Sequence, residues 1–531
     1  MKFAGAMNGR SVVGVMTVCA AVYFLLWYAP RIAPVKANVL MADDFTADPS
    51  VHLLSYRPLL YADLWFWNHV LGKGYLMTVM PKILAGIYSS LIAILTLDLL
   101  RRWRIPLLIS SIIPVFYLSH PIVNELSLWN TIASCNLSIL FILLGYWVMG
   151  DALSLRRSIP AILFMTLGVS GYQIYAGLFA VLMIGEYVIK NIYNIPFPPR
   201  EAVRKTAVII VALAIYALYV KISQSVFGLY DFGHRSFISF ESAAMADFTY
   251  AKWHGMSNMF ANVFQPLISF YFGVEASWRA WKWIPVGLGF LTLVISLFAR
   301  RSGTDTVLFG LTPIFLPALA TLILLPMNAT PSGWRVCGPV LYAFSLSLVP
   351  ALSLIMKSDD DTTVQRTLER QMFSKKVIVL GIAMFWIIMT FPIITYHGKL
   401  RMIANKQELL TLQAIEGFWE EKGIERGGYA VAVYPINNAS LMKTFAGEKG
   451  RDIVINFNRI VSYDYSNLVK GFWPQFLMHY GYRPLSEIAE KDGINRVLKE
   501  ACEKEENGSG HVKSYLKVTH LETLKLSVIC R

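Results

Sequence analysis

The chain has 531 residues, of which 55% are hydrophobic and only 15% charged, and its mean hydropathy is +0.49. Soluble domains carry about 25% charged residues, so this composition excludes a soluble protein and predicts a polytopic membrane protein. The formal net charge is +14. Of 48 Lys and Arg, 19 lie from His397 onward, as do 16 of 34 Asp and Glu, so residues 1–396 hold 29 basic and 18 acidic residues. This excess gathers in short loops between apolar segments, which argues against nucleic acid as a partner.

The first apolar segment, near residues 12–30, is bounded by Arg10 and Arg31 and is long enough to cross a bilayer. It is longer than the apolar core of a signal peptide, and no clear small-residue cleavage site ends it, so we expect a retained helix. Ten further segments of this kind follow, near 80–100, 105–122, 129–149, 159–173, 174–190, 206–225, 283–299, 306–325, 337–356 and 376–395. The sequence therefore predicts about eleven transmembrane helices. Residues 159–190 must form two of them, joined by a tight turn near Gly171.

Basic residues fall in alternate loops of this predicted bundle. They are Arg101, Arg102, Arg104, Arg156, Arg157, Arg200, Arg204, Lys205, Arg300, Arg301, Lys375 and Lys376. The short loops on the other side are almost free of them, with Arg335 the exception. Because cytoplasmic loops carry the excess of Lys and Arg, this pattern predicts a cytoplasmic N-terminus and a C-terminus outside the cytoplasm.

Three predicted outer segments are large. Two are loops, at about 31–79 and 226–282, and the second is rich in aromatic residues that suit helices at the headgroup level. The third segment mixes β-like runs (Tyr429–Tyr434, Ile453–Asn456 and Leu524–Cys530) with amphipathic helical stretches such as Glu408–Lys422, which predicts a small α/β domain. We therefore divide the chain into a membrane domain, 1–396, and an outer domain, 397–531.

The cysteines and histidines predict no metal centre. The five cysteines form no CxxC pair, and the histidines are scattered. Cys502 and Cys530 lie in the outer domain, where an oxidising compartment would permit a disulfide between them without requiring one.

The most informative polar feature is the pair Asp43-Asp44, which follows the first predicted span. Carboxylates at the outer membrane face suit the transfer of a sugar from a lipid phosphate, because a base must take the proton of the acceptor hydroxyl. The departing phosphate gains negative charge, which favours a cation beside it. No nucleotide diphosphate takes part, so a divalent metal is compatible with this chemistry but not required. The structural alternative, at about even odds, is that one Asp caps an interfacial helix.

Five further residues are candidates for substrate binding: Arg57, Arg335, Tyr56, Lys221 and Trp65. Arg335 is the single charge in its short loop and opens a predicted helix, where the helix N-terminus and the guanidinium both attract anions. Each has a structural alternative. On position alone, Arg335 is more commonly a headgroup anchor and the aromatic cluster around Trp65 an interfacial belt. The structural alternative for Arg57 is a salt bridge with a carboxylate of the same loop.

The order of these features resembles the membrane O-antigen glucosyltransferases of serotype-converting bacteriophages and their bacterial relatives, which have the GT-C architecture. The elements that carry the resemblance are the first helix, Ala42-Asp43-Asp44, Tyr56-Arg57-Pro58-Leu59, Arg335-Val336 before a helix, and the C-terminal region. The chain departs from the family at Phe45-Thr46-Ala47, where members often carry a basic residue.

The resemblance implies a bacterial inner-membrane glycosyltransferase with its chemistry and its C-terminal domain in the periplasm. The implied donor is a polyprenyl-phosphate sugar, most often undecaprenyl-phosphate glucose, and the implied acceptor is a lipid-linked O-antigen repeat of lipopolysaccharide. Asp44 or Asp43 would be the catalytic base and the other a sugar or acceptor ligand. Arg57 and Arg335 would engage the donor phosphate.

Two other interpretations stay open. A transporter or flippase for a lipid-linked sugar would place ionisable residues near the middle of the membrane, often in two related halves. Here the charged candidates lie in outer loops, and no internal repeat is visible. A GT-C enzyme with a different sugar and acceptor would show the same membrane pattern.

Overall fold

The computed structural model spans the chain and describes the residues on which the following account rests. These are 9–36, 57–71, 75–128, 135–150, 154–193, 195–227, 263–264, 266–268, 270–271, 287, 290, 303–321, 337–356, 373–399, 402, 430–433, 483–484, 515–518 and 526–528. Several predictions fall outside them, namely all of the span near 283–299 except residues 287 and 290, the pair Asp43-Asp44, Tyr56, Arg335, Cys502 and Cys530.

Five helices among the described residues are long and apolar enough to cross a membrane: Met16–Lys36, Val79–Arg102, Gln173–Asn191, Pro199–Ser223 and Phe373–Lys399. Shorter apolar helices accompany them at Leu107–Leu118, Cys135–Met149, Leu311–Ala320 and Gly338–Ser353. Each predicted span that includes described residues corresponds to a helix. The prediction of a multi-pass helical membrane protein is therefore confirmed.

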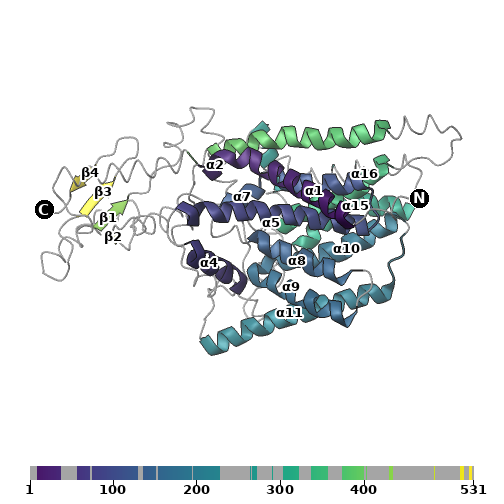
Figure 1. The fold of residues 1–531 in the computed structure, drawn as a ribbon, viewed down its shortest axis with the longest axis horizontal. Helices are drawn as coiled ribbons and strands as arrows, with labels where there is room; N and C mark the ends of the chain where they lie inside the picture. Colours follow the sequence, from purple (N-terminus) through teal and green to yellow (C-terminus); the bar gives the residue numbers. More distant parts are fainter. Residues whose placement is uncertain are drawn as a thin grey trace, which may run out of the picture.

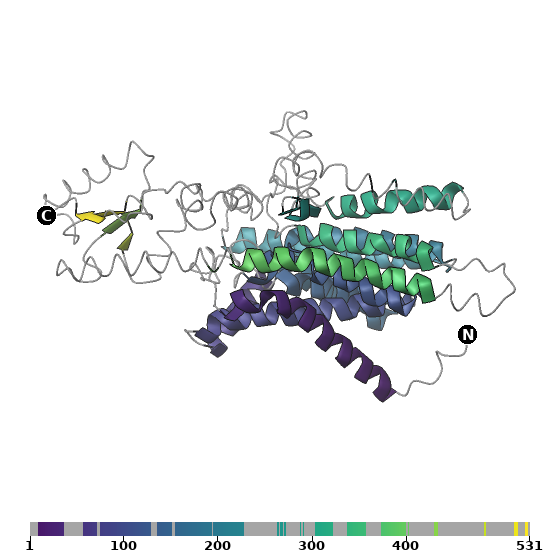
Figure 2. The same cartoon turned by 90° about the horizontal axis from the view of Figure 1, so that it is seen from above.

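The helices form one bundle (Figure 1). In chain order they are α1 (Gly9–Tyr28), η1 (Ala29–Arg31), α2 (Ile32–Lys36), α4 (Pro58–Leu71), α5 (Tyr75–Arg102), α6 (Leu107–Leu118), α7 (Val123–Leu128), α8 (Cys135–Met149), α9 (Leu155–Gly171), η3 (Gln173–Ala176), α10 (Gly177–Ile192), α11 (Pro199–Phe227), α15 (Gly303–Ala320), α16 (Gly338–Met356) and the final helix, Phe373–Lys399. Helix α11 runs along one edge of the bundle and the final helix, drawn in green, along the other. Towards its N-terminus α1 leaves the bundle obliquely (Figure 2).

The outward faces of the edge helices are apolar. In α11 the exposed side chains include Ile210, Leu218 and Ile222, and the final helix exposes Phe385 and others. Such surfaces are unfavourable in water and favourable against lipid tails. Inside the bundle, Ser and Thr hydroxyls donate to carbonyls of the preceding helical turn, as Ser90 does to Gly86 O at 2.8 Å. Their polar groups are thus satisfied without water, as a membrane interior requires.

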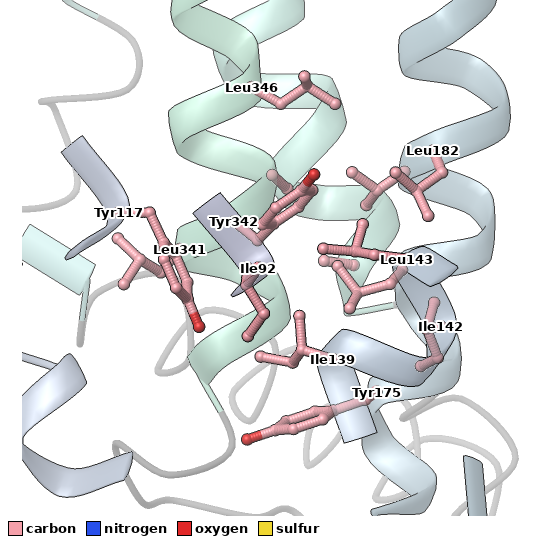
Figure 3. Close-up of a cluster of buried hydrophobic side chains, with 14 of the residues drawn as sticks. Ile92, Tyr117, Ile139, Ile142, Leu143, Tyr175, Leu182, Leu341, Tyr342 and Leu346 are labelled. Atoms are coloured by element: carbon pink, nitrogen blue, oxygen red, sulfur yellow. The ribbon is translucent and has the colours of Figure 1, made fainter. Parts of the chain in front are cut away.

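The core lies where α5, α8, α10 and α16 meet. Figure 3 shows Ile92 of α5, Ile139 of α8 and Leu341 of α16 converging there, all of them buried. Helices α8 and α9 make the most intimate contact, because glycines let their backbones approach. A Cβ on Gly168 would stand 2.6 Å from Ile142 Cγ1 and 2.9 Å from the carbonyl oxygen of Ser138. Small residues are the usual means of close helix packing in membranes.

This packing predicts a pair of opposite effects from one kind of substitution. Gly168→Ala should lower the free energy of unfolding by about 1–3 kcal/mol, because the added methyl group meets a backbone atom that cannot rotate away. Gly381→Ala is the matched control: it lies in the final helix, and nothing stands within 4 Å of its added Cβ. It should leave stability unchanged or raise it slightly through helix propensity. Thermal unfolding of both purified variants in detergent measures the difference, and equal stabilities would contradict the packing described.

The described strands beyond residue 396 form one four-stranded sheet, drawn past the end of the bundle in Figure 1. The strands are β1 (Ala430–Val433), β2 (Arg483–Pro484), β3 (Tyr515–Val518) and β4 (Leu526–Val528), in the order β2-β1-β3-β4. β1 runs parallel to β2 and β3, with Val431 opposite Leu516, and β4 is antiparallel to β3. β1 and β4 coincide with runs predicted as β-like. The helical stretch predicted near 408–422 lies outside the described residues.

Candidate functional site

The bundle has two chemically different ends. At one, which we call the basic end, Arg102 of α5 donates from Nη1 to Trp147 O of α8 at 3.1 Å, and Lys205 of α11 pairs with Glu186 of α10 at 2.8 Å. The described basic residues of the alternate loops belong to helix termini and turns at this end. At the other, the opposite end, Trp27 of α1 donates from Nε1 to Ser127 Oγ of α7 at 3.0 Å. The predicted site residues Arg57 and Trp65 belong to the opposite end.

Arg57 is held in a defined position at the opposite end. Its carbonyl accepts from Tyr61 N at 3.0 Å, which begins α4, and Pro58 occupies the first helical position, where the missing N–H is harmless. Its Nε donates to Gln173 Oε1 at 3.4 Å, and its guanidinium carbon lies 4.2 Å from the ring centroid of Tyr172. No carboxylate within the described part of the chain pairs with it. The alternative that Arg57 pairs with a loop carboxylate stays a prediction, because Asp43, Asp44 and Asp48 lie outside the described residues.

The turn between α9 and α10 places Tyr172 and Gln173 under Arg57. Helix α9 ends at Gly171, Tyr172 is extended, and the short helix η3 leads into α10. A Cβ on Gly171 would clash with Ser138 Oγ and stand 3.1 Å from Leu59 Cδ2. Only glycine lets α4 and α8 close on this turn. The tight turn predicted near Gly171 is thus confirmed, and it carries the two contacts that orient Arg57.

Tyrosines line the interior beside this turn. Tyr172 and Tyr175 have their ring centroids 5.1 Å apart, and those of Tyr117 and Tyr342 are 6.0 Å apart. Figure 3 shows Tyr117, Tyr175 and Tyr342 entering this region from three different elements. Tyr342 shares a hydrogen bond of 3.0 Å with Thr96 Oγ1. The hydroxyl of Tyr117 finds no hydrogen-bond partner in the described part of the chain. Tyr117, Tyr175 and Tyr342 are all buried in the core of the bundle.

Three other polar or aromatic residues, among them the predicted site residues Trp65 and Lys221, do not contact Arg57. Trp65 is 46% exposed on α4 and packs on His69, with ring centroids 4.1 Å apart, which fits an interfacial position. Lys221 is exposed near the end of α11, and no described contact joins it to Arg57. Asp63 accepts from Trp67 Nε1 at 3.0 Å and from the Tyr88 hydroxyl at 3.3 Å, so it fastens α4 to α5.

The segment that carries Asp43 and Asp44 lies outside the described residues, but both of its ends are fixed. At the N-terminal end, the final helix holds η1 and α2. Thr395 donates to Pro30 O at 3.5 Å, and a Cβ on Gly398 would stand 2.8 Å from Pro34 Cγ. At the C-terminal end, Arg57 is held as described above.

Two cations at the opposite end were missed by sequence reasoning. Arg31 and Lys82 are fully buried, on η1 and α5. Arg31 served only as the boundary of the first span. Lys82 was overlooked, although an ionisable residue inside a predicted span is itself a sign of function.

The described residues contain no group of three or more His, Cys, Asp or Glu placed to hold a metal ion. No protein-family model matches this chain, and no curated protein matches it significantly.

Proposed function

We propose that the protein is a GT-C glycosyltransferase that moves a sugar, glucose by the resemblance, from a polyprenyl phosphate to a lipid-linked O-antigen or similar envelope glycan. In this proposal the chain crosses the bacterial inner membrane eleven times, with the basic end in the cytoplasm. The opposite end and the α/β domain, residues 397–531, face the periplasm. The concentration of Lys and Arg at the basic end supports this orientation.

The observation that carries the proposal is the position of Arg57. Its guanidinium rests on Tyr172 and hydrogen-bonds to Gln173, and the described residues offer it no carboxylate. A cation that is positioned in advance, and that no described carboxylate neutralises, suits a group whose negative charge grows during reaction. The phosphate that leaves a polyprenyl-phosphate sugar is such a group. The tyrosines beside Arg57 would supply walls for the sugar.

The proposed reaction exchanges one bond at the anomeric carbon and transfers one proton. One carboxylate of Asp43-Asp44 takes the proton of the acceptor hydroxyl. At the same time the oxygen of that hydroxyl attacks the anomeric carbon of the sugar. The bond from that carbon to the phosphate oxygen breaks, and the electron pair stays with the phosphate. Arg57 and Arg335 would stabilise the resulting phosphate monoester, and the second Asp would bind the sugar or the acceptor.

Mass spectrometry of the O-antigen from cells with and without the protein tests this proposal. The expected result is a mass gain of one hexose per repeat unit, found only when the protein is made. If the protein is in the membrane, the donor is available and the O-antigen is unchanged, the acceptor assignment is wrong. If no envelope glycolipid gains a sugar, the transferase proposal itself is contradicted and a flippase becomes the better explanation.

The position of Arg57 yields a graded prediction. Arg57→Ala should lower the transfer rate by about 10²–10³-fold, the usual cost of removing one donor that stabilises a developing negative charge. Arg57→Lys should recover part of the rate, since an ammonium group keeps the charge but not the planar fork of donors. Arg156→Ala, an exposed residue at the basic end, should leave the rate unchanged. Transfer is measured in membranes that contain equal amounts of each variant, and full activity of Arg57→Ala would exclude Arg57 from phosphate binding.

A further inference from the structure

Two arginines from different helices approach the end of α8 at the basic end. Arg102, the last residue of α5, donates from Nη1 to Trp147 O at 3.1 Å, and its guanidinium carbon lies 4.2 Å from the ring centroid of Trp147. Arg157, in the first turn of α9, reaches the residue that follows α8: a Cβ on Gly150 would stand 3.1 Å from Arg157 Nη1. The two guanidinium groups thus flank the C-terminus of one helix.

The positive charge around this helix end is only partly neutralised by the described residues. Arg102 Nε lies 3.0 Å from Asp98 Oδ2, which also accepts from Trp147 Nε1 at 2.7 Å. Arg104 and Arg157 are exposed, and neither has a carboxylate partner in the described part of the chain. A helix C-terminus attracts cations but supplies no full negative charge. An anion from outside the chain would therefore be attracted to this region.

Arg104 occupies a backbone position that favours glycine. It follows the end of α5 and has a φ of 60°, in the left-handed region. The turn is closed by hydrogen bonds from Arg104 N to Arg101 O at 2.9 Å and from Ile105 N to Leu100 O at 3.0 Å. Glycine is the usual residue at such a helix end, because a side chain strains this conformation. The turn thus carries an exposed positive charge where glycine would be more stable.

An apolar surface runs along the helices from these arginines. Helix α8 packs between α5 and α9 (Figure 1). On α5, Leu91 is 41% exposed and lies about three turns from Arg102 on the same face. On α9, half-buried Phe164 lies about two turns from Arg157 on the same face. Its ring stacks on that of Phe141, a half-buried residue of α8, with centroids 5.9 Å apart. This surface is cationic at one end and apolar along its length.

We propose that this surface binds an anionic phospholipid of the leaflet at the basic end, with its phosphate at Arg102 and Arg157 and its acyl chains along α8. Guanidinium groups offer the paired donors that phosphate oxygens accept, and basic clusters between membrane helices suit acidic lipid head groups. A free anion would leave the apolar side chains uncovered, whereas acyl chains would cover them. The site lies at the end of the bundle away from Arg57, and the proposal does not depend on sugar transfer.

Lipid-dependent thermal stability of the full chain tests the site. The protein is purified in dodecyl maltoside, which carries no phosphate. Phosphatidylglycerol, phosphatidylcholine with the same acyl chains, and soluble glycerol 3-phosphate are each titrated at equal concentrations. We expect phosphatidylglycerol to raise the unfolding temperature, phosphatidylcholine to raise it much less, and glycerol 3-phosphate to leave it unchanged.

Three variants locate the effect. Arg157→Gln should weaken the apparent affinity for phosphatidylglycerol about fivefold, as expected for one basic residue near an anionic lipid. Arg104→Gly should raise the unfolding temperature of the lipid-free chain, because it relieves the left-handed strain, and yet weaken the response to the lipid. A purely structural role for Arg104 would not move these two measurements in opposite directions. The matched control is Lys376→Gln, an exposed residue at the basic end on the final helix, which should not change the response.

Each of three results would overturn the proposal. Equal stabilisation by phosphatidylcholine would show that the anionic head group is not recognised. An equal shift with glycerol 3-phosphate would show a site for a free anion. If Lys376→Gln weakens the response as much as Arg157→Gln does, the lipid senses the overall charge of the basic end and no defined site exists. Arg157→Lys keeps the charge and should retain most of the response.

Discussion

Replacing Asp44 by Asn is expected to lower sugar transfer by about 10²–10⁴-fold, the range that general acid–base catalysis contributes. The amide has nearly the shape of the carboxylate and still forms hydrogen bonds, but it cannot take the proton of the acceptor hydroxyl. Asp43→Asn should cost less if Asp43 binds the sugar, so the larger of the two losses identifies the base. The measurement is transfer from a polyprenyl-phosphate sugar to a lipid-linked acceptor in membranes with equal amounts of each variant.

Asp48→Asn is the matched control for this pair, because it removes one negative charge from the same segment. It should leave transfer nearly unchanged, which would separate the loss of a base from a general change in surface charge. Normal membrane insertion of all three variants is part of the expected result. Full activity of both Asp43→Asn and Asp44→Asn would remove the mechanism proposed above.

The largest stability effect is expected at the basic end, where Glu186 is fully buried between two lysines. Its carboxylate oxygens lie 2.7 Å from Lys190 Nζ and 2.8 Å from Lys205 Nζ, and the Tyr146 hydroxyl also donates to it. Glu186→Gln leaves the two lysines with Glu201 as their one remaining acidic partner among the described residues. Removing one member of a buried ion network costs about 3–5 kcal/mol, because the remaining charges stay buried. Thermal or chemical unfolding in detergent measures this loss.

A charge-balanced double variant distinguishes this cause from a simple packing defect. Glu186→Gln combined with Lys190→Gln removes one charge of each sign and should regain a substantial part of the stability lost in Glu186→Gln alone. Lys205 then keeps Glu201 as its partner at 2.8 Å. A double variant no more stable than the single one would indicate that shape, and not charge, governs this cluster.

The fold was predictable where a single physical requirement dominates. In lipid the backbone must satisfy its own hydrogen bonds, so long apolar segments such as 80–100 and 206–225 have to be helices. Helix α4 was not predicted, because its 14 residues, Pro58–Leu71, are shorter than a span and rich in aromatic residues that also suit a loop at the interface. A spacing of four places Glu186 and Lys190 on one face of a helix, where they can form a salt pair. Its partners Glu201 and Lys205 come from the next helix and depend on packing that the spacing does not encode.

The same distinction applies to the candidate site. The residue type and its place in the chain predicted Arg57 as a substrate-binding residue. Its contacts with Tyr172 and Gln173 could not be predicted, because they join positions more than a hundred residues apart. Such pairings depend on which turns meet at the opposite end. Arg31 and Lys82 show a different difficulty. At a helix end, a buried cation and one that extends into the headgroup layer have the same sequence signature, and burial distinguishes them only in the folded chain.

The fixed ends of the segment that carries Asp43 and Asp44 set a limit on where the reaction can take place. Lys36, the last residue of α2, stands seven positions before Asp43, and α2 is clamped by the final helix. At about 3.3–3.6 Å per residue, seven residues reach no further than about 25 Å. The carboxylates thus lie within about 25 Å of Lys36. Under the proposed function the acceptor hydroxyl would have to come within this distance of α2, which favours repeats close to the lipid anchor over the distant tip of a long chain.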